Sequence, residues 1–582
     1  MSWIFGILRK NKQALLPKKE YCPSRDKDKF LVETNDYYFA CGTGHKNSFY
    51  KHDKMSDSGW IVCGTGISYK DHTFRLMERE DWEAFLSIKN NNIRKLNGHF
   101  IIVEWEQGHL RIRNDQLGMR DMFFADTKNF LTFSTRLDWL IPFTNNPGID
   151  FTSYGSTWLY ISSFNYKCFV RNIIQLGQGG EARYDGKRFS KVNKQWLPEY
   201  AKAVPQKRFL ELLSELTLLG LKQNRRLLFG LSGGLDSRVV LSILLKEDMN
   251  RWEAYTFGDY GFPDVVIARK IAEKIGFKHS IIADLIPPHG EEVKNFTEFV
   301  LETNTSMNGY FLYQQDHYNH LDNSRLVIDG GAGSFCRRND SKYLWLKGKK
   351  YILRRDAEGV LQYVSLNKPM IFNKETACLM KQGGVCEINE VFDNMPSISD
   401  IGSGNWVDIF TIRYLSSNAG SLTQSRQDNM VFNYMPIFQP TVLRRILSLP
   451  VSYRGYNRIY KHVLQNGNPV LRQIPIVKDM SIIPFTQNNY LTFVLGKLFE
   501  RFQKVQTPDY AQVFLTNNKD FVLDTLKSRG VREYAYYDYQ KIKNLVNGYY
   551  SGQRSNSKSV LWWLTFDVWR RALQEKRRKL DR

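Results

Sequence analysis

The stretch Leu227-Leu228-Phe229-Gly230-Leu231-Ser232-Gly233-Gly234-Leu235-Asp236-Ser237 decides the fold of the middle of the chain. The apolar run at its start predicts a buried strand, and the apolar periodicity from Leu235 onward predicts a helix. The two adjacent glycines predict a turn in which the backbone can approach an anion, and the amides of the following helix favour phosphate. The sequence therefore predicts an α/β unit with a phosphate-binding loop.

The polar residues of this loop suit a nucleotide. The hydroxyls of Ser232 and Ser237 can donate hydrogen bonds to phosphate, and Asp236 is a candidate magnesium ligand. The loop lacks the lysine of the Walker motif, GxxxxGKS/T, so the usual kinase or ATPase reading fails. The alternative is a chance serine-glycine turn, against which the strand and helix flanks argue.

Length and composition set the wider frame. A chain of 582 residues predicts two or more domains, and its 42% hydrophobic content predicts a folded globular protein. Short alternating runs predict a strand-rich part up to about residue 200, and helical periodicity begins at Gln206. The least readable segment, about 335–405, is interpreted as an insertion. The net charge of +23 favours polyanions such as nucleotides, nucleic acids or anionic surfaces without choosing among them.

Cysteine usage and hydropathy indicate a compartment. The seven cysteines are scattered and show no CxxC spacing, so they predict reduced core residues rather than a zinc site or redox pair. The N-terminus does not have the order of a secretory signal, and no apolar run is long enough to span a bilayer. We therefore expect a cytoplasmic protein without a membrane span.

The loop Ser232–Ser237 resembles the pyrophosphatase loop, SGGxDS, of the asparagine synthetase superfamily, including asparagine synthetase B. The resemblance implies ATP and Mg²⁺ as cofactors, held by Ser232, Gly233, Gly234, Leu235, Asp236 and Ser237, with Asp236 as metal ligand. It also implies that Phe257 and Gly258, at the end of the next strand, border the adenine.

The N-terminal part is similar to the glutaminase half of the same family. Leu96-Asn97-Gly98-His99-Phe100 resembles its LNGxF motif, and the run from Arg113 to Phe124 resembles RDRxGxRPLYY. The resemblance implies two domains. Residues 1–200 would form an Ntn-type, class II glutamine amidotransferase-like α-β-β-α sandwich, and 206–582 an α/β PP-loop ATP pyrophosphatase domain with a helical extension.

Departures from the family predict that the glutaminase activity is lost. The family begins MCGIFG and uses the cysteine as nucleophile, whereas this chain has Ser2 followed by Trp3. A serine hydroxyl needs a base to activate it. The stretch Val62–Gly66 stands where the family writes NGE and lacks the asparagine amide that stabilises an oxyanion. The pattern resembles β-lactam synthetases and lasso-peptide macrolactam cyclases, which make amides without glutamine.

Two further departures affect the synthetase site. Asp329–Phe335 stands where the family writes GEGADE, and Ser334 replaces its metal-binding aspartate. Gly330 and Gly331 still permit close approach to pyrophosphate, and Asp329 or Asp340 are candidates to compensate. Lys478 partly matches the family's catalytic lysine, with an exposed loop lysine as the alternative.

The implied function is an ATP-dependent carbon-nitrogen ligase that forms AMP and pyrophosphate. A carboxylate becomes an acyl-adenylate, which an amine captures as an amide. The expected partners are a small-molecule or peptide carboxylate and an amine donor, with nucleic acid not expected. Two alternatives remain: a nucleotide-binding pseudoenzyme, favoured by Ser334, and a PP-loop RNA-modifying enzyme, which would lack the N-terminal sandwich.

Overall fold

The computed structural model describes most of the chain. The described residues are 2–16, 29–43, 47–198, 206–283, 285–286, 290–322, 324–331, 342–455, 457–478, 480–486, 491, 494–495, 498–499 and 509–578. The predicted mixed α/β class is confirmed.

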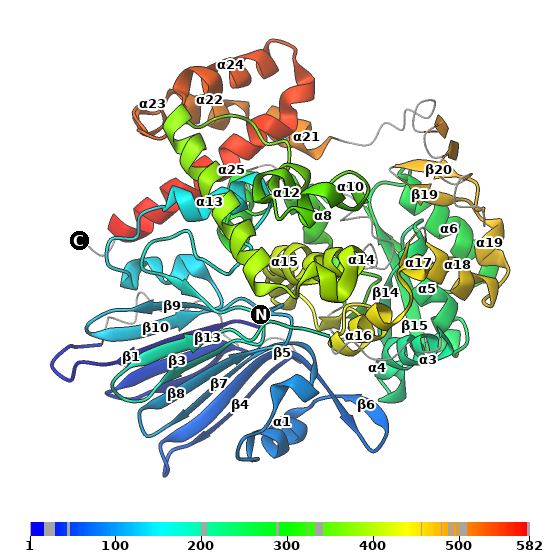
Figure 1. Ribbon diagram of the computed structural model, residues 1–582, viewed down its shortest axis with the longest axis horizontal. Helices are drawn as coiled ribbons and strands as arrows, with labels where there is room; N and C mark the ends of the chain where they lie inside the picture. Colours follow the sequence, from blue (N-terminus) through cyan, green and yellow to red (C-terminus); the bar gives the residue numbers. More distant parts are fainter. Residues whose placement is uncertain are drawn as a thin grey trace.

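Two antiparallel sheets make up the N-terminal part (Figure 1). The first has the order β11 (Ile174–Gln175), β9 (Phe123–Asp126), β10 (Phe130–Ser134), β1 (Ile4–Arg9), β3 (Tyr37–Gly42), β2 (Lys29–Glu33). The second has the order β13 (Phe189–Val192), β12 (Glu181–Tyr184), β8 (His109–Asn114), β7 (Asn97–Glu106), β5 (Ser58–Lys70), β4 (Ser48–Asp53), and β6 (Thr73–Leu76) also pairs with β5.

The two sheets face each other across a shared hydrophobic core. Ile4 and Phe39 of the first sheet cluster there with Ile61 and Ile101 of the second. The outer face of the second sheet is covered by α1 (Arg79–Leu86), whose Trp82 is fully buried. On the outer side of the first sheet lie α2 (Phe151–Leu159) and the C-terminal α25 (Ser557–Arg578). Side chains along each strand therefore point alternately inward to this core and outward to a layer of helices.

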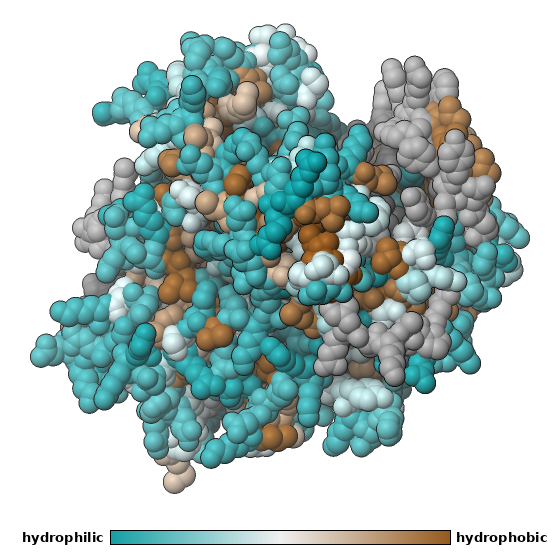
Figure 2. Space-filling model, viewed as in Figure 1, coloured by the Kyte–Doolittle hydropathy of each residue, from teal (hydrophilic) through white to brown (hydrophobic). Residues whose placement is uncertain are grey.

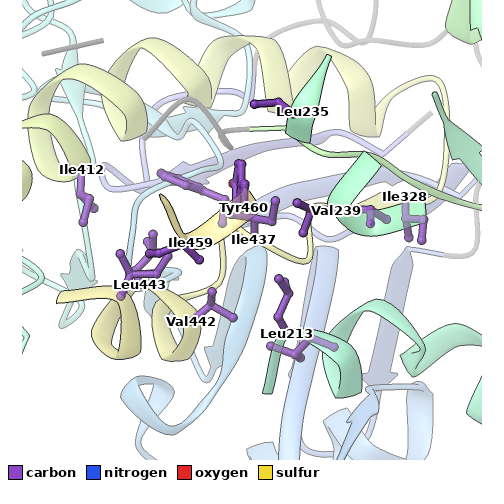
Figure 3. Close-up of a cluster of buried hydrophobic side chains, with 14 of the residues drawn as sticks. Leu213, Leu235, Val239, Ile328, Ile412, Ile437, Val442, Leu443, Ile459 and Tyr460 are labelled. Carbon is purple, nitrogen blue, oxygen red and sulfur yellow. The ribbon is translucent and has the colours of Figure 1, made fainter. Parts of the chain in front are cut away.

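A five-stranded parallel sheet forms the second α/β unit. Its order is β16 (His279–Ile282), β15 (Trp252–Phe257), β14 (Leu227–Gly230), β17 (Leu326–Ile328), β18 (Asn433–Tyr434). The associated helices are α3 (Gln206–Thr217), α4 (Leu219–Lys222), α5 (Leu235–Leu244) and α6 (Pro263–Ile275). Leu235 and Val239 of α5 join a buried cluster with side chains of α16 (Pro440–Ser448) and α18 (Arg458–Gln465) (Figure 3).

Helices fill the remainder of the C-terminal part. They are α7 (Glu292–Thr303), α8 (Phe311–Gln315), α10 (Lys342–Leu346), α11 (Lys349–Leu353), α12 (Ala357–Val364), α13 (Lys374–Asn394), α14 (Ile398–Phe410), α15 (Ser417–Asp428), α17 (Val451–Arg454), α19 (Val470–Gln473), α21 (Tyr510–Asn517), α22 (Lys519–Lys527), α23 (Arg529–Arg532) and α24 (Tyr539–Tyr550). A small hairpin, β19 (Ile476–Lys478) with β20 (Ser481–Ile483), completes the fold. No helix among the described residues is both long and apolar enough to cross a membrane.

The segment interpreted as an insertion contributes to the main core. Ile352, Val360 and Ile388 from this segment are buried in the same cluster as α5. Its longest helix, α13, crosses α2 at very close range. A Cβ on Gly383 would lie 1.9 Å from the Thr152 carbonyl oxygen, so glycine is required at the crossing.

The prediction that the cysteines are core residues is wrong for two of them. Cys41 and Cys63 are buried, but Cys378 and Cys386 are exposed on α13. The buried residues of α13, which include Met380, Gly383 and Val391, follow helical periodicity, and the two cysteines lie on the other face.

Candidate functional site

The candidate site lies where the strand order of the parallel sheet reverses. From β14 the chain passes to β15 and β16 on one side, and it later returns to β17 and β18 on the other. In open α/β sheets, ligands bind beyond the carboxyl ends of the strands at this reversal. The loop Ser232–Ser237 leaves the end of β14, and the segment Asp329–Gly331 leaves the end of β17.

Short hydrogen bonds organise the first loop. The Ser232 amide donates to Ser237 Oγ at 3.1 Å, and the two hydroxyl oxygens lie 3.0 Å apart. The Gly234 amide donates to Ser232 Oγ at 3.3 Å. Gly234 is the N-cap of α5, and no side chain caps that helix. The turn is therefore held in place by its own serines at a helix N-terminus suited to an anion.

The two glycines have different surroundings. A Cβ on Gly233 would lie 2.3 Å from Val477 Cγ2, and the Val477 amide donates to the Gly233 carbonyl at 3.0 Å. The Gly233 amide donates to Asp264 Oδ1 at 2.7 Å. Among the described residues, only Ser232 Oγ would lie within 4 Å of a Cβ on Gly234, at 3.4 Å. Gly233 thus fits β19 against the loop, whereas the described residues leave space beside Gly234.

The second loop touches the first. A Cβ on Gly330 would lie 3.0 Å from both the Asp236 carbonyl carbon and the Ser237 amide nitrogen. The Gly331 amide donates to Asp329 Oδ1 at 2.6 Å. Burial raises the pKa of Asp329, and the hydrogen bond from Gly331 partly offsets this shift. Gly330 therefore brings the end of β17 against the first turn of α5.

Phe257 and Gly258 lie on the neighbouring strand end. Gly258 has a φ of 120° and donates its amide to the Ile282 carbonyl at 2.9 Å. The Phe257 side chain is 37% exposed, and its ring stacks on His317 with centroids 4.1 Å apart. Burial lowers the pKa of His317 to about 4, so this ring is neutral near pH 7. One face of Phe257 is already covered.

Arg238 is a residue that sequence reasoning missed. Its guanidinium donates to the carbonyls of Leu471 and Ile474, each at 2.8 Å, and to the Gly233 carbonyl at 3.2 Å. The side chain is fully buried, and burial lowers its pKa to about 9. An arginine inside the apolar run of α5 was the available signal. It connects the loop to the segment that leads into β19.

Lys478 ends the strand that packs on the loop. It pairs with Ser481 across the β19–β20 hairpin, and its side chain is half-buried. Its neighbour Val477 contacts Gly233 directly, so the backbone of Lys478 is one residue away from this contact. Ser334 and Asp340 lie outside the described residues.

The carboxylates near the two loops decide whether magnesium could bind there. Asp236 is in the first turn of α5, and Asp264 and Asp329 accept hydrogen bonds from glycines of the two loops. Within the described ranges, no group of three or more His, Cys, Asp or Glu side chains forms a metal cluster. Protein-bound Mg²⁺ usually takes one or two carboxylates together with substrate phosphates, which fits this donor set.

A second cluster surrounds Ser2 in the N-terminal part. Ser2 is fully buried, and its hydroxyl accepts from Ser48 Oγ at 3.1 Å. Arg120 donates to the Ser2 carbonyl at 2.6 Å and to Asp428 Oδ2 at 2.7 Å. His99 Nε2 lies 3.0 Å from Asp428 Oδ1. Asp428 belongs to α15, so the C-terminal part supplies a buried carboxylate to this cluster.

The motif that resembles LNGxF also contacts the C-terminal part. Thr441 donates its amide and hydroxyl to Asn97 Oδ1 at 3.0 and 2.7 Å. The Gly98 amide donates to Gln439 Oε1 at 2.8 Å. These residues therefore hold the two parts of the chain together.

The fold and the site define a class: an α/β protein with an SGGxDS-type loop at the switch point of a parallel sheet. Residues 208–286, which include the loop, match the asparagine synthase family. This match supports membership of the asparagine synthetase superfamily for that part of the chain.

Other comparisons give partial likenesses. No curated protein matches the sequence. Glutamine phosphoribosylpyrophosphate amidotransferase from B. subtilis, solved with ADP and GMP, is 6% identical with a TM-score of 0.21. The match covers 48% of this chain and 65% of that protein. Glutamine-dependent NAD+ synthetase from Acinetobacter baumannii, solved with ADP, is 14% identical with a TM-score of 0.18, and the match covers 43% of this chain and 61% of that protein. The U34-tRNA thiolase from Methanococcus maripaludis is 12% identical with a TM-score of 0.17, covering 36% and 78%. This chain thus spans less than two thirds of the first two proteins.

Proposed function

We propose that the protein is an ATP-dependent amide-forming ligase that produces AMP and pyrophosphate without hydrolysing glutamine. In this proposal 1–200 is a vestigial amidotransferase-like domain and 206–582 is the synthetase domain of a cytoplasmic enzyme. The observation that carries it is the contact between the two strand-end loops, in which Gly330 lies against Asp236 and Ser237. A bound triphosphate would have both loops within reach.

The loop residues have distinct proposed roles. Ser232, Gly234, Leu235 and Ser237 would bind the pyrophosphate portion through hydroxyls and first-turn amides. Gly233 would hold β19 in place, and Gly330 and Gly331 would let the second loop approach the phosphates. Phe257 and Gly258 would border the adenine.

The proposed reaction balances in two steps. A carboxylate oxygen of the substrate forms a bond to the α-phosphorus of ATP, and the bond from that phosphorus to the pyrophosphate oxygen breaks. An amine nitrogen then forms a bond to the acyl carbon, AMP leaves, and the amine loses a proton. The positive charge of Lys478 would stabilise the negative charge that develops on the phosphates during the first step.

Magnesium fits the site as a cofactor. Asp236 and Asp329 would hold it, with phosphate oxygens completing its coordination. When bound, Mg²⁺ neutralises charge on the phosphates. The protein's own contribution would be to hold Asp236, in the first turn of α5, beside the segment that carries Asp329 at the end of β17.

Ser2 supports loss of glutaminase activity. Its side chain is buried, and its carbonyl and hydroxyl are both engaged by neighbours. A nucleophile must reach its substrate and be activated by a base. We expect the purified protein to release no ammonia from glutamine above background. Glutamate production that Ser2→Ala abolishes would contradict this part of the proposal.

A nucleotide-binding pseudoenzyme is the second candidate. It is favoured by the Gly233 amide, which donates to Asp264 rather than facing open space. The two candidates differ in turnover. Pyrophosphate release should be measured against magnesium concentration with fractionated carboxylate pools for the wild type, Ser334→Asp and Lys478→Ala.

The ligase predicts release in the wild type, equal or higher release in Ser334→Asp at limiting magnesium, and loss in Lys478→Ala. ATP binding without release in any fraction, with no rescue by Ser334→Asp, would instead establish the pseudoenzyme.

A further inference from the structure

The helices α10 and α11 carry an unusual surface that the proposed ligase does not use. Residues 342–355 contain six basic residues and no acidic one: Lys342, Lys347, Lys349, Lys350, Arg354 and Arg355. Among residues 344–355, whose side chains the structure describes, the exposed ones are Leu346, Lys347, Lys349, Lys350, Leu353, Arg354 and Arg355. We call these residues the α10–α11 surface.

Each of the two helices buries one aliphatic side chain in the core and exposes another at the surface. Leu344 and Ile352 are buried in the main core and anchor the two helices. Leu346 and Leu353 are 54% and 55% exposed. A single exposed leucine needs no explanation, but two of them among clustered basic residues form a mixed apolar and cationic face. Figure 2 shows hydrophobic atoms among strongly hydrophilic ones on the face that carries α10, α12 and α14.

Within the described part of the chain, most of the positively charged groups of this surface have no acidic partner. Arg355 pairs with Asp393 at 2.6 Å. Among the described residues, Lys347, Lys349, Lys350 and Arg354 form no ion pair. The ammonium groups of Lys349 and Lys350 instead lie over the rings of Trp345 and Tyr351, at 5.8 and 4.8 Å from the centroids. The surface therefore favours an anionic partner.

We propose that the α10–α11 surface docks on a lipid bilayer that contains anionic lipids. Lysine and arginine side chains would contact the anionic headgroups, while Leu346 and Leu353 would enter the boundary between headgroups and acyl chains. The net charge of +23 would attract the whole molecule to such a surface. The association is peripheral, through two short helices that remain anchored by Leu344 and Ile352.

The surface fits a bilayer better than single-stranded nucleic acid. Nucleic-acid sites of this kind stack bases on exposed aromatic rings. Here Trp345 and Tyr351 are only partly exposed, and a lysine ammonium lies over each ring. The exposed apolar groups are aliphatic leucines, which insert into lipid but offer no stacking face.

Vesicle sedimentation with the full-length protein tests the proposal. Vesicles of phosphatidylcholine alone are compared with vesicles of phosphatidylcholine and phosphatidylglycerol, at low and high salt. We expect binding only to the anionic vesicles. Lys349→Glu/Lys350→Glu should weaken it at least about 25-fold, from roughly fivefold per charge removed. Leu346→Ser/Leu353→Ser should weaken it about tenfold.

The control changes the same kinds of side chain elsewhere. Lys54→Glu/Met55→Ser alters an exposed lysine and a 99% exposed methionine at the β4–β5 turn and should bind vesicles as the wild type does. All the altered side chains are exposed, and unchanged circular dichroism verifies folding.

Failure to bind any vesicle overturns the proposal. Loss of binding with the lysine but not the leucine variant would mean charge adsorption only. Retention of RNA that depends on Lys349 and Lys350, without vesicle binding, would assign the surface to nucleic acid. None of these outcomes depends on the ligase activity.

Discussion

Asp236 is the loop residue whose charge matters most in the proposed site. It lies in the first turn of α5, against Gly330 of the second loop. We expect Asp236→Ala to weaken Mg²⁺-ATP binding about tenfold or more, because interactions of a charged group contribute about 1.5–3 kcal/mol. Calorimetric titration measures the change. Asp259→Ala, in the loop after β15, is a matched control. Unchanged affinity in a folded Asp236→Ala protein would mean that the loop is only a structural turn.

Glu387 on α13 predicts a pH dependence of stability. One carboxylate oxygen accepts from the Phe164 amide at 2.6 Å and from Ser163 Oγ at 3.0 Å, and burial raises the pKa to about 7. A pKa raised above the unfolded value gives stability that is present at low pH and lost as pH rises through the folded value. We therefore expect Glu387 to destabilise the protein as pH rises from about 5 to 8.

Replacement of this carboxyl by an uncharged amide isolates its contribution. Glu387→Gln should flatten the part of the pH dependence that Glu387 causes. The melting temperature of the variant should therefore fall less than that of the wild type between about pH 5 and 8, a window that runs from above the ordinary glutamate pKa to just above the folded pKa of about 7. Differential scanning fluorimetry across this range checks it. Parallel curves for the two proteins would show that Glu387 does not titrate there.

At the scale of elements, the contact between β19 and the loop is the feature that local sequence could not reveal. The strand before the loop, the helix after it and the glycine turn all have local signatures, and the structure places them as β14, α5 and the turn between them. Val477 has no local signature, and Arg238 shows only that an arginine stands in an apolar run. Their roles arise from contacts with residues more than 200 positions away. Periodicity carries no information about such contacts.

The β19 contact gives a prediction about Gly233. Gly233→Ala would place its methyl group 2.3 Å from Val477 Cγ2, so we expect β19 to be displaced and stability to fall by about 1–3 kcal/mol. Adding Val477→Ala should restore part of that loss. Urea unfolding of both single variants and the double variant forms a cycle. Strictly additive effects would show that the two side chains do not clash.

On the scale of the whole molecule, the N-terminal and C-terminal parts share a buried charged cluster. Resemblance predicted two parts, but it did not predict that Asp428 would contact Arg120 and His99. Those contacts join residues about 300 positions apart, and no motif marks Asp428. The residues that resemble glutaminase motifs therefore hold the two parts together.

Removing one partner of this cluster should be costly. Arg120→Ala leaves the fully buried Asp428 without its closest cation, and we expect a loss of about 3–5 kcal/mol. The paired replacement Arg120→Met/Asp428→Leu should lose less than the sum of its single changes, because it leaves no lone charge. Chemical unfolding monitored by tryptophan fluorescence gives these values. An unchanged free energy of unfolding in Arg120→Ala would mean that the cluster does not stabilise the contact between the two parts.

The central claim is that the touching loops of β14 and β17 activate a carboxylate with ATP. Its most direct test is carboxylate-dependent exchange of labelled pyrophosphate into ATP, which requires the acyl-adenylate step but no amine. Carboxylate fractions that support exchange with the wild type should support none with Asp236→Ala or Lys478→Ala. We predict exchange that requires Mg²⁺ and both side chains. Exchange unaffected by either substitution, or ATP hydrolysis to ADP and phosphate in its place, would contradict it.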